Sequence, residues 1–192
     1  MAVKDAILAI LTLGSAYGLQ LRDELVHRAP HRAGLNVGQV YSTLDRLSKA
    51  GLLTSDEVTD DNLPLYALTP AGRQAAADWL AEPTPADVKS WPDMADQVLV
   101  ASSIPGSAWR TIVARQIASW EPEADAVTRV TEDAPGAVQL SSAISADQHI
   151  ARAAIEWLRE TEHRLASGGD PGMPLRSIRP QRGRRPGPLS RP

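Results

Sequence analysis

Apolar residues recur at helical spacing through most of the chain, and one stretch shows this pattern most clearly. Its apolar positions, which fall on one side of a helix, are Val37, Val40, Leu44 and Leu47. Asn36 precedes them and Gln39 follows three residues later, which is close to a capping box. Gly51 stands where a left-handed residue commonly ends a helix. The pattern predicts a helix from about residue 36 to residue 50.

Two predicted helices precede this one, and two short strands and a further helix follow it. The helices lie at residues 3–13 and 17–28, and the strands at about 52–58 and 64–69. Turn residues between the strands are Asp60, Asp61 and Asn62. The last helix ends near Glu82. This order is typical of a winged helix-turn-helix, which usually presents one helix to the DNA major groove.

The chain beyond residue 82 divides into a helical part and a polar tail. Three helical patterns lie at roughly 93–104, 106–132 and 141–166. Residues 168–192 hold six Arg against one acidic residue, with six Pro and five Gly, and such a composition does not bury enough apolar surface to fold. We therefore expect a mainly α fold with a small two-stranded β-wing. Its predicted parts are a winged helix-turn-helix DNA-binding domain (1–82), a helical dimerisation and effector domain (83–167) and a disordered tail (168–192).

Composition and motifs exclude several classes of site. Cysteine is absent, which excludes disulfides and thiolate metal sites. His27 and His31 have the spacing of a helical metal pair, but Pro30 lies between them, so we expect no metal and no cofactor. The sequence has no phosphate loop and no nucleophile elbow, and it does not predict an enzyme. The apolar opening stretch is too short for a membrane span, and we expect a cytoplasmic protein without a membrane partner.

The polar side of the helix at 36–50 carries side chains that hydrogen-bond base edges and phosphates. The candidate DNA-binding residues are Asn36, Gln39, Tyr41, Ser42, Thr43, Arg46 and Lys49. Arg46 is the candidate for a contact inside the groove, and Tyr41 lies on the flank. The alternative interpretation is a solvated helix face with a packed tyrosine.

Four short stretches of the chain resemble the PadR family of bacterial transcriptional regulators. They are ILAILTLGSAYGLQL at 7–21, VGQVYSTLDRL at 37–47, GLL at 51–53 and YALTPAGR at 66–73. The C-terminal region resembles the longer type of this family more weakly, through DMADQVLVA at 93–101. The resemblance implies a bacterial protein that dimerises through its C-terminal helices. It also implies repression of a nearby gene, relieved by a small, often aromatic or drug-like molecule.

The charge of the predicted winged domain departs from the Arg- and Lys-rich wings that are common in this family. Asp60 and Asp61 occupy the turn, and residues 1–82 hold 7 basic and 10 acidic residues. Because nonspecific DNA affinity comes from phosphate neutralisation, we expect it to be weak. In one alternative the wing tilts away and the contacts fall to Tyr41, Arg46, Lys49, His31 and Arg32. In the other the Arg-rich tail binds the DNA backbone, rather than being a dispensable extension.

Tryptophans beyond the winged domain are candidates for effector contacts, because flat rings bury aromatic ligands well. They are Trp91, Trp109, Trp120 and Trp157. Trp157 shares a helix with apolar residues at seam-like spacing, namely Ile150, Ala154, Leu158 and Leu165. This seam favours a dimer interface, with a ligand pocket as the alternative.

Together these features predict a sequence-specific, ligand-responsive repressor that acts as a homodimer on an inverted-repeat DNA operator. The acidic wing favours an alternative, a winged helix that binds another protein. An activator that contacts polymerase is a further alternative.

Overall fold

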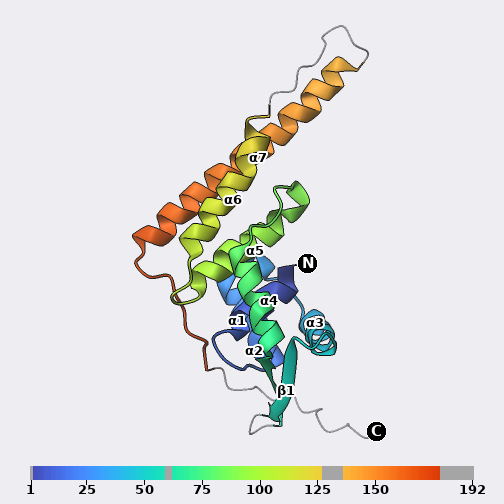
Figure 1. The fold of residues 1–192 in the computed structure, drawn as a ribbon, viewed down its shortest axis with the longest axis vertical. Coiled ribbons are helices and arrows are strands. Elements are labelled where there is room, and N and C mark those ends of the chain that lie inside the picture. The colour runs from blue at the N-terminus through green and yellow to red at the C-terminus, as the bar shows by residue number, and fades with distance from the viewer. Residues whose placement is uncertain (1, 59–61, 127–135, 178–192) are drawn as a thin grey trace, which may run out of the picture.

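A computed structural model describes residues 2–58, 62–126 and 136–177 of the chain (Figure 1). The described residues form seven α-helices, two short 3-10 helices and one two-stranded antiparallel sheet. The predicted fold class, mainly α with a small β-wing, is confirmed. None of the helices in the described ranges is both long and apolar enough to cross a membrane.

The first part of the fold, residues 2–82, is called the winged unit here. Its elements are α1 (Ala2–Leu11), α2 (Gly18–Arg28), the 3-10 helix η1 (Pro30–Arg32), α3 (Val37–Lys49), β1 (Leu53–Val58), β2 (Pro64–Leu68) and α4 (Pro70–Ala81). Helix α1 lies at its centre, because the residues from Ala6 to Leu11 are all buried. The apolar stripe predicted for α3 faces the same core, where Val40, Leu44 and Leu47 are buried.

Local hydrogen bonds set the beginnings of α3 and α4. Asn36 Oδ1 accepts from the Gln39 backbone N–H at 2.8 Å, and the Asn36 N–H donates to Gln39 Oε1 at 3.2 Å, which completes a capping box. Thr69 Oγ1 accepts from the backbone N–H of Gly72 at 3.1 Å. A Cβ on Gly72 would lie 2.0 Å from the carbonyl oxygen of Leu52, so only glycine lets α4 approach the wing this closely.

Strands β1 and β2 pair antiparallel and form the wing. Leu53 and Leu68 lie opposite each other at its base and are buried, which fixes the wing to the core. The predicted turn residues Asp60 and Asp61 lie outside the described ranges.

The remaining elements are helical. They are the 3-10 helix η2 (Val88–Ser90), α5 (Trp91–Ser103), α6 (Trp109–Ala124) and α7 (Ala137–Ser167). Helices α6 and α7 pack along each other as a long antiparallel hairpin that projects away from the other helices (Figure 1). Helix α6 ends at Ala124, before the end predicted near residue 132, and Pro122 removes a backbone donor close to this end.

The apolar seam predicted on α7 packs within the protomer. Ala154 and Leu158 are fully buried, in one core cluster with Ile112 and Trp120 of α6. The prediction that this seam faces a second subunit is therefore wrong for these positions, because α6 already covers them.

Two buried glutamines join the winged unit to the C-terminal helices across the boundary predicted near residues 83–85. The Gln97 side-chain amide on α5 donates to the Glu82 carbonyl at 2.7 Å. Gln116 on α6 donates to Gln97 Oε1 at 2.6 Å. The end of the winged unit is thus held by polar contacts on both following helices.

Residues 168–177 form an ordered extension, called the C-terminal strap, which runs from the end of α7 back along the winged unit (Figure 1). The Met173 N–H donates to the Ser103 carbonyl at 2.7 Å, and Leu175 packs against the core of the winged unit. The prediction of a disordered tail is wrong for this strap, because its few apolar and charged side chains find buried partners. Residues 178–192 lie outside the described ranges.

Candidate nucleic-acid interface

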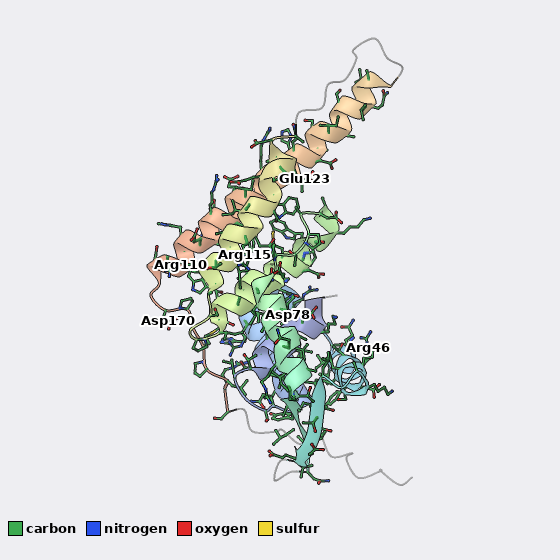
Figure 2. The ribbon with its side chains drawn as sticks, viewed as in Figure 1. Arg46, Asp78, Arg110, Arg115, Glu123 and Asp170 are labelled. Atoms are coloured by element: carbon green, nitrogen blue, oxygen red, sulfur yellow. The ribbon has the colours of Figure 1, made fainter. Side chains whose placement is uncertain are left out.

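Helices α2 and α3, with η1 between them, have the arrangement of a helix-turn-helix, in which the second helix enters the major groove. Helix α2 packs against α3. Figure 2 shows α3, which carries Arg46, at the edge of the molecule. One side of α3 is therefore buried against the winged unit, and the other side is open.

Most of the predicted DNA-binding residues lie on the open side of α3 or at its cap. The exposed ones are Asn36, Gln39, Tyr41, Ser42, Arg46 and Lys49. Thr43 is only 7% exposed, and its hydroxyl donates to the Gln39 carbonyl at 2.8 Å. The predicted place of Thr43 on the open face is wrong, because it falls on the edge of the buried stripe.

Arg46 is held loosely along its own helix. Its Nε donates to the Ser42 carbonyl at 3.2 Å, and its Nη2 donates to Thr43 Oγ1 at 3.3 Å. Both partners are neutral, so these bonds do not cancel the charge, and both are near the long end of the hydrogen-bond range. A guanidinium held in this way can turn outward to bind a guanine edge or a phosphate with two hydrogen bonds.

The ring of Tyr41 lies on Gly18 at the beginning of α2. A Cβ on Gly18 would lie 2.5 Å from the Tyr41 ring, so glycine permits this contact. Tyr41 still keeps 39% of its surface exposed. Burial raises the pKa of the neighbouring Tyr17 and Tyr66. The contact fixes the flank of α3 to the first turn of α2, the helix that crosses the DNA backbone in helix-turn-helix docking.

Most cations of the winged unit already lie beside a carboxylate. It has seven Lys and Arg residues. Among the described residues, five of them lie within 4.0 Å of a carboxylate oxygen, namely Lys4, Arg22, Arg28, Arg32 and Lys49. Their charges are largely balanced where they stand, so they add little to the long-range attraction of DNA.

His31 and Arg32, which the sequence offered as phosphate contacts, face the C-terminal helices. Arg32 Nη2 and His31 Nε2 lie 2.7 Å and 2.8 Å from the carboxylate of Asp96, a fully buried residue of α5. Hydrogen bonding to Asp96 raises the pKa of Arg32. Both side chains thus join the winged unit to α5, and the expectation that they grip phosphate is not supported by their positions.

The wing adds no positive charge. Residues 52–69 contain four acidic residues and neither Lys nor Arg. Asp56 and Glu57 are exposed in its described part. Because carboxylates repel phosphate, attraction to DNA has to come from α3 and from outside the wing.

The four candidate effector tryptophans occupy two different settings. Trp109 and Trp120 are 6% and 3% exposed, and Trp120 Nε1 lies 3.2 Å from Met94 Sδ. Trp91 and Trp157 are half-buried, and their ring centroids are 5.2 Å apart. The structure thus brings Trp91 and Trp157 together and places the other two in the core.

The winged unit contains the part of the chain that matches a known protein family. Residues 7–78 match the family described as the Transcriptional regulator PadR-like family. The winged unit belongs to this family. The resemblance predicted from the sequence is therefore confirmed over these residues, which include the helix-turn-helix and the wing.

A solved structure similar to this chain is the crystal structure of Bacillus subtilis PadR in complex with operator DNA. The two sequences are 18% identical, and the likeness covers 83% of this chain and 97% of that chain, with a TM-score of 0.39. No curated protein matches the chain.

A cavity of about 430 Å³ lies behind α3 of the PadR-like unit. Its mainly apolar wall comes from the beginning of α1, the inner edge of α3 and the beginning of α5, and includes Val3, Leu47, Arg46 and Asp93. This volume is in the range of small-molecule sites. The sequence did not indicate it, because its walls come from three helices that are distant along the chain.

Proposed function

We propose that the chain is a ligand-responsive repressor that binds an inverted-repeat operator as a homodimer through α3. The observation that carries the proposal is the open polar side of α3 on a PadR-like winged unit. Gln39, Ser42 and Arg46 follow one another at spacings of three and four residues on this side, as a helix in the major groove requires. Asn36 and Tyr41 lie at its start and flank, and Lys49 at its end, where phosphates would pass.

A second copy of the chain is proposed to dock on the projecting α6–α7 hairpin. Two large apolar residues at the beginning of α7, Val138 and Leu140, are 72% and 52% exposed. A symmetric dimer would hold two α3 helices at a fixed spacing. The operator should then be an inverted repeat with half-sites about 34 Å apart or somewhat more.

An effector would act by favouring a spacing of the two α3 helices that does not fit the operator. Two places suit an aromatic ligand, the half-buried Trp91–Trp157 pair and the cavity behind α3. A ligand in the cavity would touch both Arg46 of α3 and Asp93 of α5, so its binding would couple the DNA-reading helix to the C-terminal helices.

Selection of bound fragments from random DNA tests the DNA-binding part of the proposal. We expect the retained fragments to share one inverted repeat, and light scattering of the complex to give two chains per operator. The acidic wing favours a second candidate, a winged helix that binds another protein. That candidate predicts no retention of any fragment even at low salt.

Tryptophan fluorescence tests the effector part. An aromatic ligand at Trp91 and Trp157 should quench the emission, and Trp157→Phe should reduce the quenching. Saturating operator DNA should weaken ligand binding by the same factor by which the ligand weakens operator binding. A ligand that releases DNA without this reciprocity would contradict a thermodynamic coupling of the two sites.

A further inference from the structure

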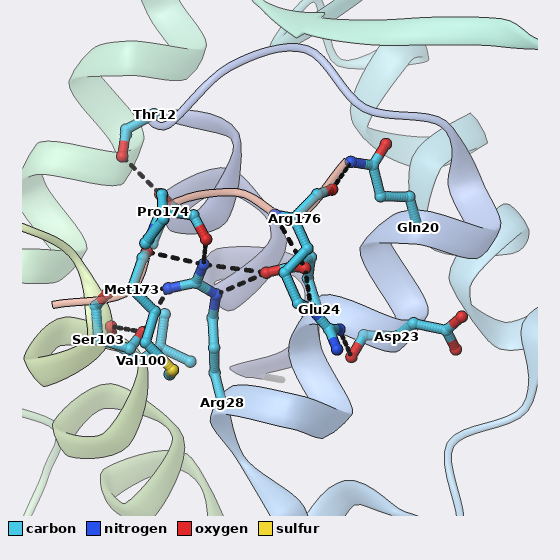
Figure 3. A network of polar contacts seen from close by, with 11 residues as sticks. Thr12, Gln20, Asp23, Glu24, Arg28, Val100, Ser103, Met173, Pro174 and Arg176 are labelled. Atoms are coloured by element: carbon cyan, nitrogen blue, oxygen red, sulfur yellow. Dashed lines mark hydrogen bonds and ion pairs between the residues drawn. The ribbon is translucent and has the colours of Figure 1, made fainter. Parts of the chain in front are cut away.

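The C-terminal strap is tied to α2 by a buried network of charged groups (Figure 3). Glu24 and Arg28, one turn apart on α2, both have fully buried side chains. Arg28 Nε and Nη2 donate to Glu24 Oε2 at 3.1 Å and 2.9 Å, while Glu24 Oε1 accepts from Arg176 Nε at 2.6 Å. A buried carboxylate is stable in such a place only with a full set of donors.

Arg28 joins three segments that are far apart in the sequence. Its Nη1 donates to the Ser103 carbonyl at 2.9 Å and to Ser103 Oγ at 2.8 Å, at the end of α5. Its Nη2 also donates to the carbonyls of Met173 and Pro174, at 3.0 Å and 3.1 Å. Every nitrogen of this guanidinium thus has a protein acceptor, and the strap supplies two of the acceptors.

The same contacts close the base of the α6–α7 hairpin. The chain leaves α5 at Ser103 to begin the hairpin, and it returns from the end of α7 through the strap. The Met173 N–H donates to the Ser103 carbonyl at 2.7 Å, and a Cβ on Gly172 would lie 2.9 Å from the Pro105 Cα. The outgoing and returning segments therefore touch each other, and Arg28 holds both of them on α2.

The end of the strap is fastened to the part of α2 that supports the reading helix. Arg176 Nη2 donates to the Asp23 carbonyl at 2.9 Å, and the Arg176 carbonyl accepts from Gln20 Nε2 at 2.8 Å. Two residues before Gln20 lies Gly18, on which the Tyr41 ring of α3 packs. A displacement of the strap would therefore act on the helix to which α3 is fixed.

Helix α5 links the hairpin to the winged unit, because it belongs to two cores at once. Val100 and Ile104 lie in the core of the winged unit, whereas Met94, Val98 and Ala101 lie in the core formed with α6 and α7. A connection through a single helix leaves rotation about that helix as an easy motion. The strap runs from α7 to α2, on the two sides of this connection, and so opposes the rotation.

The buried charges favour a single geometry for this junction. A well-packed apolar pair at the same place would stabilise the fold as well as a buried ion pair does. A guanidinium, by contrast, needs its acceptors in fixed directions around a planar group. Here the acceptors come from α2, from the end of α5 and from the strap, so Arg28 sets the placement of these three segments relative to one another.

We propose that Arg28 and the strap form a clasp that sets the orientation of the α6–α7 hairpin relative to α3, and thereby the half-site spacing that a dimer accepts. Arg28 is then a positioning residue, which acts on operator choice without touching DNA. This inference rests on the proposed function, in which two chains dock through their hairpins and each α3 reads one half-site. A dimer with an open clasp would still bind DNA, but it would accept several spacings.

Operators with altered spacing test the clasp on the full chain. The probes are the inverted repeat selected from random DNA and two derivatives with one and two base pairs inserted between its half-sites. Each inserted base pair moves one half-site by about 3.4 Å and turns it by about 35° around the duplex. The wild-type protein should lose at least about tenfold in affinity with one inserted base pair, because one α3 then leaves its base contacts.

Two glycines inserted between Gly169 and Asp170 lengthen the strap in its exposed part and replace no residue that bonds to Arg28 or Arg176. Affinity for the operator with one extra base pair should come within about threefold of that for the original operator, whose own binding should weaken about three- to tenfold. Affinity for a random duplex should change less than about twofold, because no charge is altered. The same two glycines placed directly after Ser177, beyond the described strap contacts, should leave the wild-type spacing profile.

Arg28→Lys tests the centre of the clasp. Lysine keeps a positive charge beside Glu24, but its single ammonium does not also reach Ser103 and the strap. The variant should relax the spacing preference in the same direction as the inserted glycines. Ile7→Val is the control, because it removes one methyl group from the core of the winged unit, away from the clasp, and should keep the wild-type profile. Circular dichroism and light scattering check that each variant is folded and dimeric.

The outcomes separate the clasp from the proposed function. A wild-type spacing profile in the folded, dimeric glycine-insertion protein overturns the role of the strap, whether or not Arg28→Lys folds. The same profile in folded Arg28→Lys overturns the role of Arg28. In both cases the wild-type chain still binds its inverted repeat, so the proposed function stands. Absence of DNA binding by the wild-type chain, or binding of one chain to a site without a repeat, overturns the proposed function and the clasp together.

Discussion

The Glu24–Arg28 pair of α2 and the Glu160–Arg164 pair of α7 have the same i,i+4 spacing but opposite surroundings. Their N–O distances are 2.9 Å and 2.7 Å. The side chains of the α2 pair are fully buried, whereas those of the α7 pair are 54% and 77% exposed. Water solvates the α7 pair whether or not it forms, so it contributes about 0.3 to 0.5 kcal/mol. The α2 pair has lost its water, and only its complete set of partners offsets that loss.

Breaking the buried pair should give the largest effect. Arg28→Met leaves the Glu24 carboxylate without its main donors and also frees the carbonyls of Ser103 and the strap. We expect the free energy of unfolding to fall by about 3 to 5 kcal/mol, measured by urea denaturation. Arg164→Met is the matched control, with an expected change below about 0.5 kcal/mol. Equal losses in the two variants would contradict the assigned difference in environment.

An intermediate case is the contact between η1 and α5, where the carboxylate is buried but its partners are not. Asp96 is fully buried, whereas the side chains of Arg32 and His31 are 24% and 35% exposed. Asp96→Asn should lower the free energy of unfolding by about 1.5 to 3 kcal/mol, because a neutral amide accepts more weakly and introduces donors that face Arg32. Thermal unfolding measures the change. Asp93→Asn, whose carboxylate is 3.8 Å from Arg32 and 30% exposed, should cost less than about 1 kcal/mol.

Arg46 on α3 differs from the buried pair, because its replacement should affect DNA binding strongly and the free energy of unfolding only slightly. Arg46 is exposed and bonded only to neutral groups of its own helix in the contacts described above. Arg46→Ala should weaken operator binding by about 1 to 3 kcal/mol while the free energy of unfolding changes by less than about 0.5 kcal/mol. Fluorescence anisotropy with the selected operator and urea denaturation give the two numbers. Wild-type affinity in this variant would remove Arg46 from the interface.

The parts of the fold that the sequence predicted are those controlled by neighbours in the chain. Asn36 and Gln39 are three residues apart, and they form the capping box that the pattern indicated. Gly51 takes a φ of 72° at the end of α3, as the stop signal required. Local spacing is sufficient for such features, because both partners lie within one helical turn.

The position of Thr43 could have been predicted from the helical period, but its polar side chain suggested the exposed face instead. It falls three residues after Val40 and four before Leu47, so the period that identified the buried stripe also places Thr43 beside it. Its polar character suggested the open face, but its hydroxyl is satisfied by the backbone of its own helix.

The strap and the α7 seam depended on contacts that spacing does not encode. Glu24 and Arg176 are 152 residues apart, so composition alone assigned the strap to a tail without structure. The apolar period of α7 indicated that Ala154 and Leu158 are buried, but it did not indicate against what. Packing against α6 of the same chain and packing against a second subunit require the same apolar period.

A third pair with the same spacing, Asp45–Lys49 on α3, gives the finest test of the comparison. Its N–O distance is 2.8 Å, and its side chains are 58% and 75% exposed, so it resembles the α7 pair and should open readily to a phosphate. Asp45→Asn removes a carboxylate beside the DNA and leaves the Lys49 charge unbalanced. Affinity for a random duplex at low salt should therefore rise about three- to tenfold, with a stability change below about 0.5 kcal/mol. Lys49→Ala should lower the affinity for the random duplex and make the dependence of log affinity on log salt shallower by about 1. Unchanged affinity in both variants would place this end of α3 away from the phosphates.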